Sequence, residues 1–181
     1  QEWDNKRRKY TRKFLNPEWT QAISLRKTSF IAQVLPKEKQ SNKSIDFWWI
    51  VGRYLADGWR IDKLKNSRGN SKERGEFGRV IICCGKHESN NLEKRIGKIF
   101  HATKVIERTV CKFHINNTEF YKFLEQFGKY SYGKVLPGWV FELDKNSACA
   151  LFEGWITGDG FFEKRNNCWK GTTTSKSLAL G

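Results

Sequence analysis

The chain has 181 residues, enough for one domain or slightly more, and its hydrophobic content of 38% can build a core, which argues against wholesale disorder. Its formal net charge of +15 makes a polyanion the leading partner, usually nucleic acid, although a basic surface that only prevents aggregation is the plainer alternative. The sequence has no long apolar run, no basic amphipathic helix and no signal peptide, so we expect no membrane partner.

The cysteine and methionine content indicates the cellular compartment and whether the sequence is a whole protein. Five cysteines are present, and none forms a C-x-x-C pair, so neither a disulfide framework nor a zinc site is expected. This cysteine usage fits a reducing, cytoplasmic compartment. The chain contains no methionine, even at position 1, and ends at Gly181, so we interpret it as a piece of a longer protein.

The first elements in chain order are extended. Residues 1–13 are basic, and residues 18–36 alternate apolar and polar side chains at strand-like spacings. Residues 38–43 are polar and charged, which is typical of a linker. The sequence therefore predicts a short β segment over residues 1–37 followed by this linker.

A helix with a clear start and end follows. Ser44 can cap it, Asp46 sits favourably in its first turn, and Gly58 can end it in a left-handed conformation. Its last residue is Asp57, an acid at the helix end that already carries partial negative charge, which is mildly unfavourable. The position of this acid therefore needs a reason other than helix stability.

Hairpins and helices alternate along the rest of the chain. The predicted elements are a hairpin over 59–84, a helix over 89–100 capped by Ser89, a hairpin over 104–117, a helix over 117–128 closed by Gly128, an extended connector over 129–144, a helix from 146 to 159, and a strand-like stretch with a helix start beyond it.

This order indicates an internal repeat with a period of 102 residues. In this register Gly52 aligns with Gly154, and Asp57 aligns with Asp159. The two repeats cover residues 44–145 and 146–181, and the second repeat is truncated.

Two helices that each end on an acid suggest a shared site. Gly52 and Gly154 would let the helix backbones approach closely, and parallel packing would then bring Asp57 and Asp159 together. Neighbouring carboxylates repel each other, and a divalent cation removes that cost. Hard oxygen ligands suit Mg²⁺, which bridges to phosphate oxygens, so paired acids in a basic chain indicate phosphodiester cleavage. A pair of packed core helices with locally capped acids is the structural alternative.

The strings IVGRYLADG (50–58) and FEGWITGDG (152–160) resemble the paired LAGLIDADG motifs of homing endonucleases in their two-repeat, single-chain form. They match at the third-position glycine, the eighth-position aspartate and the final glycine, and they depart at the first two positions, where Glu153 needs an outward-facing place. The resemblance covers roughly residues 44–181. It implies an α+β fold, in which α-ββ-α-ββ-α repeats form a saddle-shaped antiparallel sheet, and Mg²⁺-dependent, site-specific cleavage of double-stranded DNA.

The same resemblance implies roles for individual residues. Asp57 and Asp159 would be catalytic and would hold the metal, with the backbone carbonyls of Ala56 and Gly158 as further ligands. Lys134, in the connector string GKVLPGWV, would support the attacking water or the phosphate. An ordinary solvated lysine is the plainer interpretation of Lys134.

DNA contact is expected from the hairpins, because a two-stranded ribbon fits the major groove. Most basic side chains there would contact phosphates or solvent, and a few would contact bases. The candidates are Arg60, Lys63, Lys65, Arg68, Lys72, Arg74, Arg79, Lys104, Arg108 and Lys112.

The N-terminal segment resembles something else. Through Trp19, Ala22, Leu25 and Pro36, residues 14–37 resemble the strand pair of an intein splicing domain just before its endonuclease insert, although Thr28-Ser29 stands where Gly-Asp is usual. An unrelated basic extension is the alternative. The intein resemblance implies host-protein exteins as partners of the parent, with splicing residues outside this chain, and the two-motif form implies a monomer with internal pseudo-symmetry.

Two other functions stay open. The fold could serve as a non-cleaving DNA- or RNA-binding module or splicing helper, or the chain could be an inactive intein relic. Even if the parent is a nuclease, we expect the isolated fragment to cut poorly, because it lacks most of one DNA-binding half and would expose apolar surface.

Overall fold

A computed structural model describes residues 2–4, 9–11, 24, 38–61 and 78–180. The chain divides into two compact units, Gln1–Pro36 and Lys37–Gly181. In the first unit, β1 (Glu2–Asp4) pairs with β2 (Lys9–Thr11) in an antiparallel hairpin, which lies within the β segment predicted over residues 1–37. The strand pair predicted within 14–37 lies almost entirely outside the described residues.

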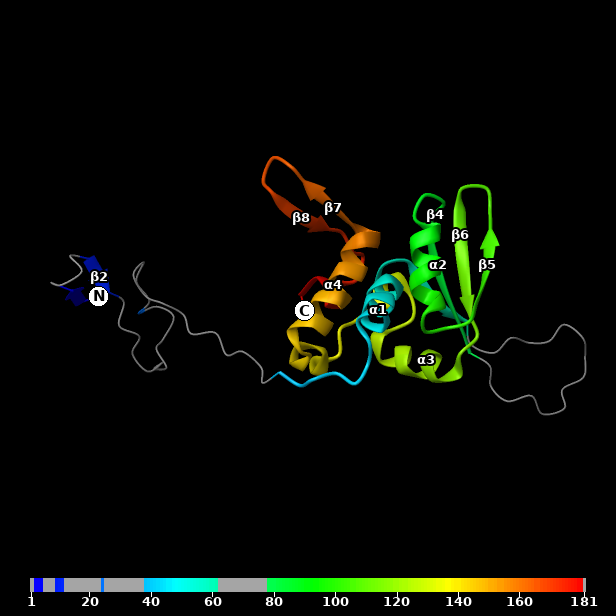
Figure 1. Cartoon of the computed structure of the whole chain (residues 1–181), viewed down its shortest axis with the longest axis horizontal. Helices are drawn as coiled ribbons and strands as arrows, with labels where there is room; N and C mark the ends of the chain where they lie inside the picture. Colours follow the sequence, from blue (N-terminus) through cyan, green and yellow to red (C-terminus); the bar gives the residue numbers. More distant parts are fainter. Residues whose placement is uncertain (1, 5–8, 12–23, 25–37, 62–77, 181) are drawn as a thin grey trace, which may run out of the picture. The chain divides into compact units, whose positions relative to one another are not determined.

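The second unit has the predicted order of helices and hairpins, and Figure 1 shows them in sequence colours. It is a mixed arrangement of helices with antiparallel sheet. Its elements are α1 (Ile45–Asp57), β3 (Gly58–Ile61), β4 (Arg79–Gly85), α2 (Ser89–Gly97), β5 (Ala102–Ile106), β6 (Val110–Ile115), α3 (Thr118–Phe123), α4 (Lys145–Asp159), β7 (Gly160–Glu163), β8 (Cys168–Gly171) and α5 (Lys176–Leu180).

The described strands of this unit form two sheets rather than one saddle. One sheet has the order β3-β4-β6-β5 and is antiparallel throughout, and β7 pairs with β8 in a separate two-stranded sheet. In β6 the buried positions alternate, and in β4 they do so except at Ile81, which is also buried, so one face of the larger sheet faces the helices and the other is the more open one. The helix-facing side chains of these two strands are Val80, Ile82, Cys84, Cys111, Phe113 and Ile115.

Helix α1 is the centre of the core. Every residue from Phe47 to Leu55 is buried, so α1 is surrounded on all sides instead of presenting one apolar face. The Tyr54 hydroxyl donates to the Gly128 carbonyl at 2.6 Å and ties α1 to the end of the α3 region. Within the described residues, no helix is long and apolar enough to cross a membrane.

The structure tests three predictions about where helices begin and end. Ser44 caps α1 as expected and accepts from the Phe47 amide at 3.2 Å. Gly58 is not left-handed: its φ is −104°, and it starts β3. Space explains the glycine, since an added Cβ would lie 2.6 Å from Tyr54. Ser89 does not cap α2, because Glu88 already has helical angles and occupies the cap position.

The segment expected to be a linker is bonded to the connector ahead of α4. Lys39 forms a parallel bridge with Leu143, and the Ser41 amide donates to the Asp144 carboxylate at 3.1 Å. The predicted extended connector also contains short 3₁₀ helices, at Ser131–Gly133 and Gly138–Glu142. Asp144 then caps α4 by accepting from the Ser147 amide.

Candidate active site

Helices α1 and α4 meet at the two motif glycines. A Cβ added to Gly52 would lie 2.1 Å from the Leu151 carbonyl oxygen, and one added to Gly154 would lie 2.0 Å from the Trp49 carbonyl oxygen. A Cβ on Gly158 would lie 2.5 Å from the Ala56 Cβ. The C-terminal ends of both helices are therefore on the same side of the crossing, and each ends on its acid.

The second motif position in α4 faces outward. The Glu153 side chain is 60% exposed, and its carboxylate lies 3.6 Å from Arg95 Nη2. Arg95 also pairs with Asp46 of α1 at 3.6 Å, and its guanidinium lies 4.4 Å from the Trp49 ring centroid. The unusual glutamate of this motif is thus part of a surface bridge between α1, α2 and α4.

Asp57 and Asp159 share an electrostatic environment at the helix ends. Burial raises the pKa of the Asp57 carboxyl, while the Arg53 guanidinium opposes this shift. Burial also raises the pKa of the Asp159 carboxyl, and the negative charge of Asp57 raises it further. The pair therefore has the unfavourable like-charge character that a bound cation would relieve.

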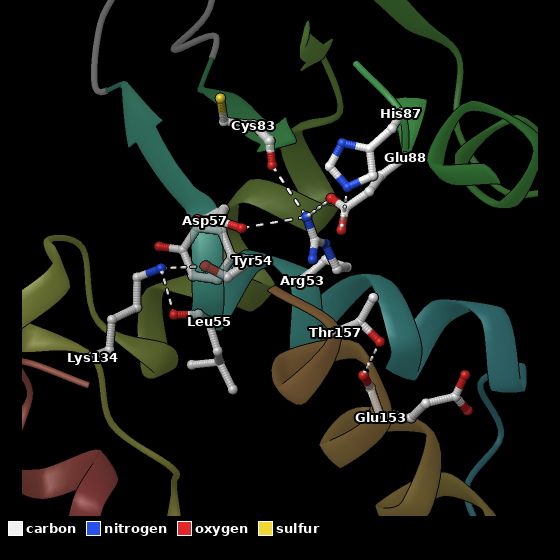
Figure 2. A network of polar contacts seen from close by, with 10 residues as sticks. All are labelled: Arg53, Tyr54, Leu55, Asp57, Cys83, His87, Glu88, Lys134, Glu153 and Thr157. Carbon is white, nitrogen blue, oxygen red and sulfur yellow. Dashed lines mark hydrogen bonds and ion pairs between the residues drawn. The ribbon is translucent and has the colours of Figure 1, made fainter. Parts of the chain in front are cut away.

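Lys134 lies under the end of α1 and is not an ordinary solvated lysine, because it is 2% exposed. Figure 2 shows its ammonium donating to the carbonyl oxygens of Tyr54 and of Leu55, the latter at 3.2 Å. The ammonium also donates to the Gly58 carbonyl at 2.7 Å. It thereby binds the C-terminal end of α1, where carbonyls lack helical partners, although the Tyr54 carbonyl also accepts from the Gly58 amide. Burial lowers the pKa of Lys134 from 10.5 to about 7, although both acids of the pair act to raise it.

Sequence reasoning missed two residues of this site, Arg53 and Glu88. Arg53 is 1% exposed and lies one helical turn before Asp57. Figure 2 shows its Nη2 atom between Asp57 Oδ2, at 3.3 Å, and Glu88 Oε2, at 3.4 Å. The same atom donates to the Cys83 carbonyl at 3.4 Å. An arginine within an otherwise apolar helix, four residues before the acid, was the available signal.

The donor set at the helix ends fits a hard divalent cation only in part. Two carboxylates are present, but no group of three or more acidic, histidine or cysteine side chains gathers at one point within the described residues. Further ligands would have to be backbone carbonyls, water or a bound phosphate, which is the usual situation for Mg²⁺. The Ala56 carbonyl is not one of the three acceptors of Lys134.

Asp57 of the acid pair lies near the open face of the four-stranded sheet. Burial, and then the charge of Asp57, raise the pKa of Cys83, which occupies an open-face position of β4. Lys112 shares this face, and its Nζ lies 5.9 Å from the Trp59 ring centroid. Arg79 is held there by Asn116, since its Nε donates to the Asn116 Oδ1 at 2.8 Å.

His114 is an open-face residue that the sequence did not single out. It lies next to Arg79, whose Nη1 is 3.5 Å from the His114 Nδ1. Burial and the positive charges of Arg79 and Lys112 lower its pKa. Its alternation with Lys112 along β6 was the signal that could have identified it.

Two of the residues predicted to contact DNA project toward the helices and away from the open face of the sheet. Arg60 is paired with Val80 and Lys104 with Phe113, so both project toward the helices. The Arg60 guanidinium lies 5.0 Å from the Tyr121 ring centroid, and the Lys104 Nζ lies 2.7 Å from a Glu93 oxygen. Strand alternation therefore gives these side chains packing partners instead of an open surface.

The other residues predicted to contact DNA lie in the β5–β6 turn, on the open face or outside the described residues. Arg108 is exposed in the turn between β5 and β6. Lys112 pairs with Glu107 at 2.6 Å on the open face. The five remaining candidates lie outside the described residues, and they are Lys63, Lys65, Arg68, Lys72 and Arg74.

No protein-family profile and no curated protein matches this chain, whereas solved structures do. A complex of the homing endonuclease I-DmoI with DNA and Ca shares 14% identity, covers 67% of this chain and 59% of its own, and has a TM-score of 0.42. The meganuclease I-SmaMI bound to uncleaveable DNA shares 12% identity over 64% of this chain and 58% of its own, with a TM-score of 0.37. The chain thus spans about three fifths of the length of these structures. A likeness this distant assigns no function to the chain.

Proposed function

We propose that this chain carries the acid pair of a site-specific, double-stranded DNA endonuclease of the homing type, which hydrolyses phosphodiester bonds with Mg²⁺. The observation that supports this most is the meeting of two glycine-containing helices that each end on an acid, with the charge of Asp57 raising the pKa of Asp159. Asp57 lies near an open sheet face that carries Arg79 and Lys112, which gives a polyanion a place to bind.

Each residue has a role in this proposal. Asp57 and Asp159, with the carbonyls of Ala56 and Gly158, would hold the cation. A divalent cation bound there would supply Lewis acidity and charge neutralisation. The Lys134 ammonium donates to three carbonyls at the end of α1. We therefore propose that Lys134 positions Asp57 and does not itself contact the attacking water or the phosphate.

The chemistry is tested with Asp57→Asn and Asp159→Asn. Both variants and the unaltered chain are incubated with supercoiled plasmid carrying a randomised insert, in Mg²⁺ or Mn²⁺, and nicked and linear products are sequenced. We expect the unaltered chain to cut weakly, at a restricted set of sites, and each variant to lose this weak cutting while it keeps its affinity for duplex DNA. If both variants cut as well as the unaltered chain does, the assignment of the two acids is refuted.

The same experiment separates the endonuclease from its rivals. A chain that binds duplex DNA in a salt-dependent way but never cuts it supports the non-cleaving binding module or splicing helper. A chain that neither binds nor cuts supports the inactive relic.

We further propose that the endonuclease belongs to an intein. The support is the sequence pattern of Trp19, Ala22, Leu25 and Pro36, which lies outside the described residues. The test is to recover the complete reading frame, express it between two reporter domains, and look for a ligated reporter product with the insert removed. If the complete frame contains no splicing blocks and yields no ligated product, the intein proposal fails, and the nuclease proposal is unaffected.

A further inference from the structure

A buried arginine makes the two acids of the pair unequal. The Arg53 side chain is 1% exposed, and its Nη2 atom lies 3.3 Å from Asp57 Oδ2 (Figure 2). A charged side chain is almost never this buried unless its charge is compensated. Asp57 and Glu88 provide that compensation, and Glu88 comes from the start of α2, so the arginine joins two elements around one acid.

The second acid lacks such a partner. In the repeat register, Arg53 corresponds to Trp155, whose indole carries no charge. Burial and the charge of Asp57 raise the pKa of Asp159, and Trp155 and the more distant charges of Lys134 and Arg53 oppose this shift without forming an ion pair. In the part of the chain that the structure describes, no lysine or arginine forms an ion pair with Asp159. The internal symmetry of the helices therefore does not extend to their charges.

The guanidinium also lies at the seam between the two helices. A Cβ added to Gly158 would be 2.8 Å from Arg53 Nη1 and 2.8 Å from Asp57 Oδ2. The Nη1 and Nε atoms are buried without a hydrogen-bond partner among the described residues, so all contacts of the guanidinium go through Nη2. The positive charge is thus held next to the residue that precedes Asp159.

We propose that Arg53 is a positioning residue and the resident counter-cation of the acid pair: it holds Asp57 in the metal-free protein and lowers the affinity of the pair for a divalent cation. This inference rests on the proposed metal-dependent function. Arg53 repels an approaching cation across a partly buried site, where charges interact more strongly than in water. Asp159, which has no such partner, is then the acid on which cation binding depends most.

The first test uses metal-free protein and needs no activity. Thermal unfolding in EDTA is compared for Asp57→Asn and Asp159→Asn, each with and without Arg53→Met. Both substitutions relieve the repulsion, but Asp57→Asn removes the ion-pair partner of Arg53, whereas Asp159→Asn removes only weaker attractions to Lys134 and Arg53. We therefore expect the higher Tm for Asp159→Asn, and no difference between the two acid variants once Arg53→Met is present. Equal Tm values with Arg53 in place, or a difference that survives Arg53→Met, would overturn the pairing.

The second test titrates Mn²⁺ alone into the chain by calorimetry. We expect Arg53→Met and Arg53→Gln to bind Mn²⁺ about tenfold more tightly than the unaltered chain, because a repulsive charge has been removed. Arg53→Lys, which keeps the charge, should bind as the unaltered chain does. A purely structural arginine would give the opposite result, since loosening the site weakens binding.

Arg95→Gln is the matched control. Arg95 also bridges α1 and α4, through Asp46 and Glu153, but does not pair with the acids at the helix ends. Its replacement should leave Mn²⁺ affinity unchanged. Equal or weaker Mn²⁺ binding by both neutral Arg53 variants overturns the counter-cation role. If the unaltered chain binds no Mn²⁺ at all, the proposed metal-dependent function fails together with the affinity claim, and the unfolding comparison still decides whether Arg53 holds Asp57.

Discussion

Gly154 of α4 packs against the backbone of Trp49 in α1 so closely that a Cβ added to it would lie 2.0 Å from the Trp49 carbonyl oxygen. Gly52 makes the reciprocal approach, with an added Cβ 2.1 Å from the Leu151 carbonyl oxygen. Both contacts are with backbone, which cannot rotate away as a side chain can. The two glycines therefore fix the separation of the helices and, through it, the spacing of the acids.

A methyl group at either position should force the helices apart. We expect Gly52→Ala and Gly154→Ala each to lower the free energy of unfolding by about 3 kcal/mol, the upper range for overpacked cores. Urea denaturation followed by tryptophan fluorescence measures this. Gly97→Ala is the control, because nothing lies within 4 Å of its added Cβ and alanine favours a helix. Comparable unfolding midpoints for Gly154→Ala and Gly97→Ala would show that the crossing is not fixed by the glycines.

The open sheet face should carry duplex DNA binding. Arg79→Ala and Lys112→Ala are each expected to weaken binding to any duplex and to reduce the slope of log K against log salt by about 1, as expected for loss of one phosphate contact. Fluorescence anisotropy of labelled duplex over a salt series gives both quantities. Lys104→Ala serves as the control, because Lys104 projects to the helix side and pairs with Glu93. If Lys104→Ala changes the slope as much as Lys112→Ala does, the open face is not the binding surface.

Arg60 should matter for stability and not for DNA. Its side chain is 8% exposed, faces the Tyr121 ring and lies 3.6 Å from the Glu125 carboxylate. We expect Arg60→Ala to cost about 2 kcal/mol of folding free energy, mainly through lost packing of the arginine stem, while the DNA salt slope stays unchanged. Chemical denaturation and the anisotropy series check the two halves of this prediction. A changed slope with unchanged stability would return Arg60 to the set of DNA contacts.

The sequence predicted the elements of this fold better than the faces of its sheet. The alternation of helices and hairpins, and the paired Gly and Asp positions, follow from local patterns that repeat along the chain. The direction of Arg60 and Lys104 depends on the register of their strands with β4 and β6, and a slip of one residue reverses it. Nothing local in the sequence of these hairpins fixes that register.

The candidate site also combines features that local sequence patterns predict with features that depend on long-range contacts. Asp57 and Asp159 are visible as acids at unfavourable helix ends. The burial of Lys134 and the pairing of Arg53 with Glu88 are long-range: 80 residues separate Lys134 from Tyr54, and 35 separate Arg53 from Glu88. Residues joined across such distances carry no periodicity, so their partners become known only once the chain is folded.

Lys134 should give the protein a pH-dependent stability on the alkaline side of neutrality. Its pKa falls from 10.5 in the unfolded chain to about 7 in the fold, so above about pH 7 the unfolded state holds a proton that the folded state has lost. Stability contributed by this group therefore rises with pH, by up to about 1.4 kcal/mol per unit. We expect the difference in unfolding free energy between the unaltered chain and Lys134→Met to rise from pH 7 to pH 9. Urea denaturation at successive pH values measures it, with the exposed Lys94→Met as the control that should give a flat difference. A flat difference for Lys134→Met as well would mean that the three carbonyls at the end of α1 keep the buried ammonium charged throughout this range.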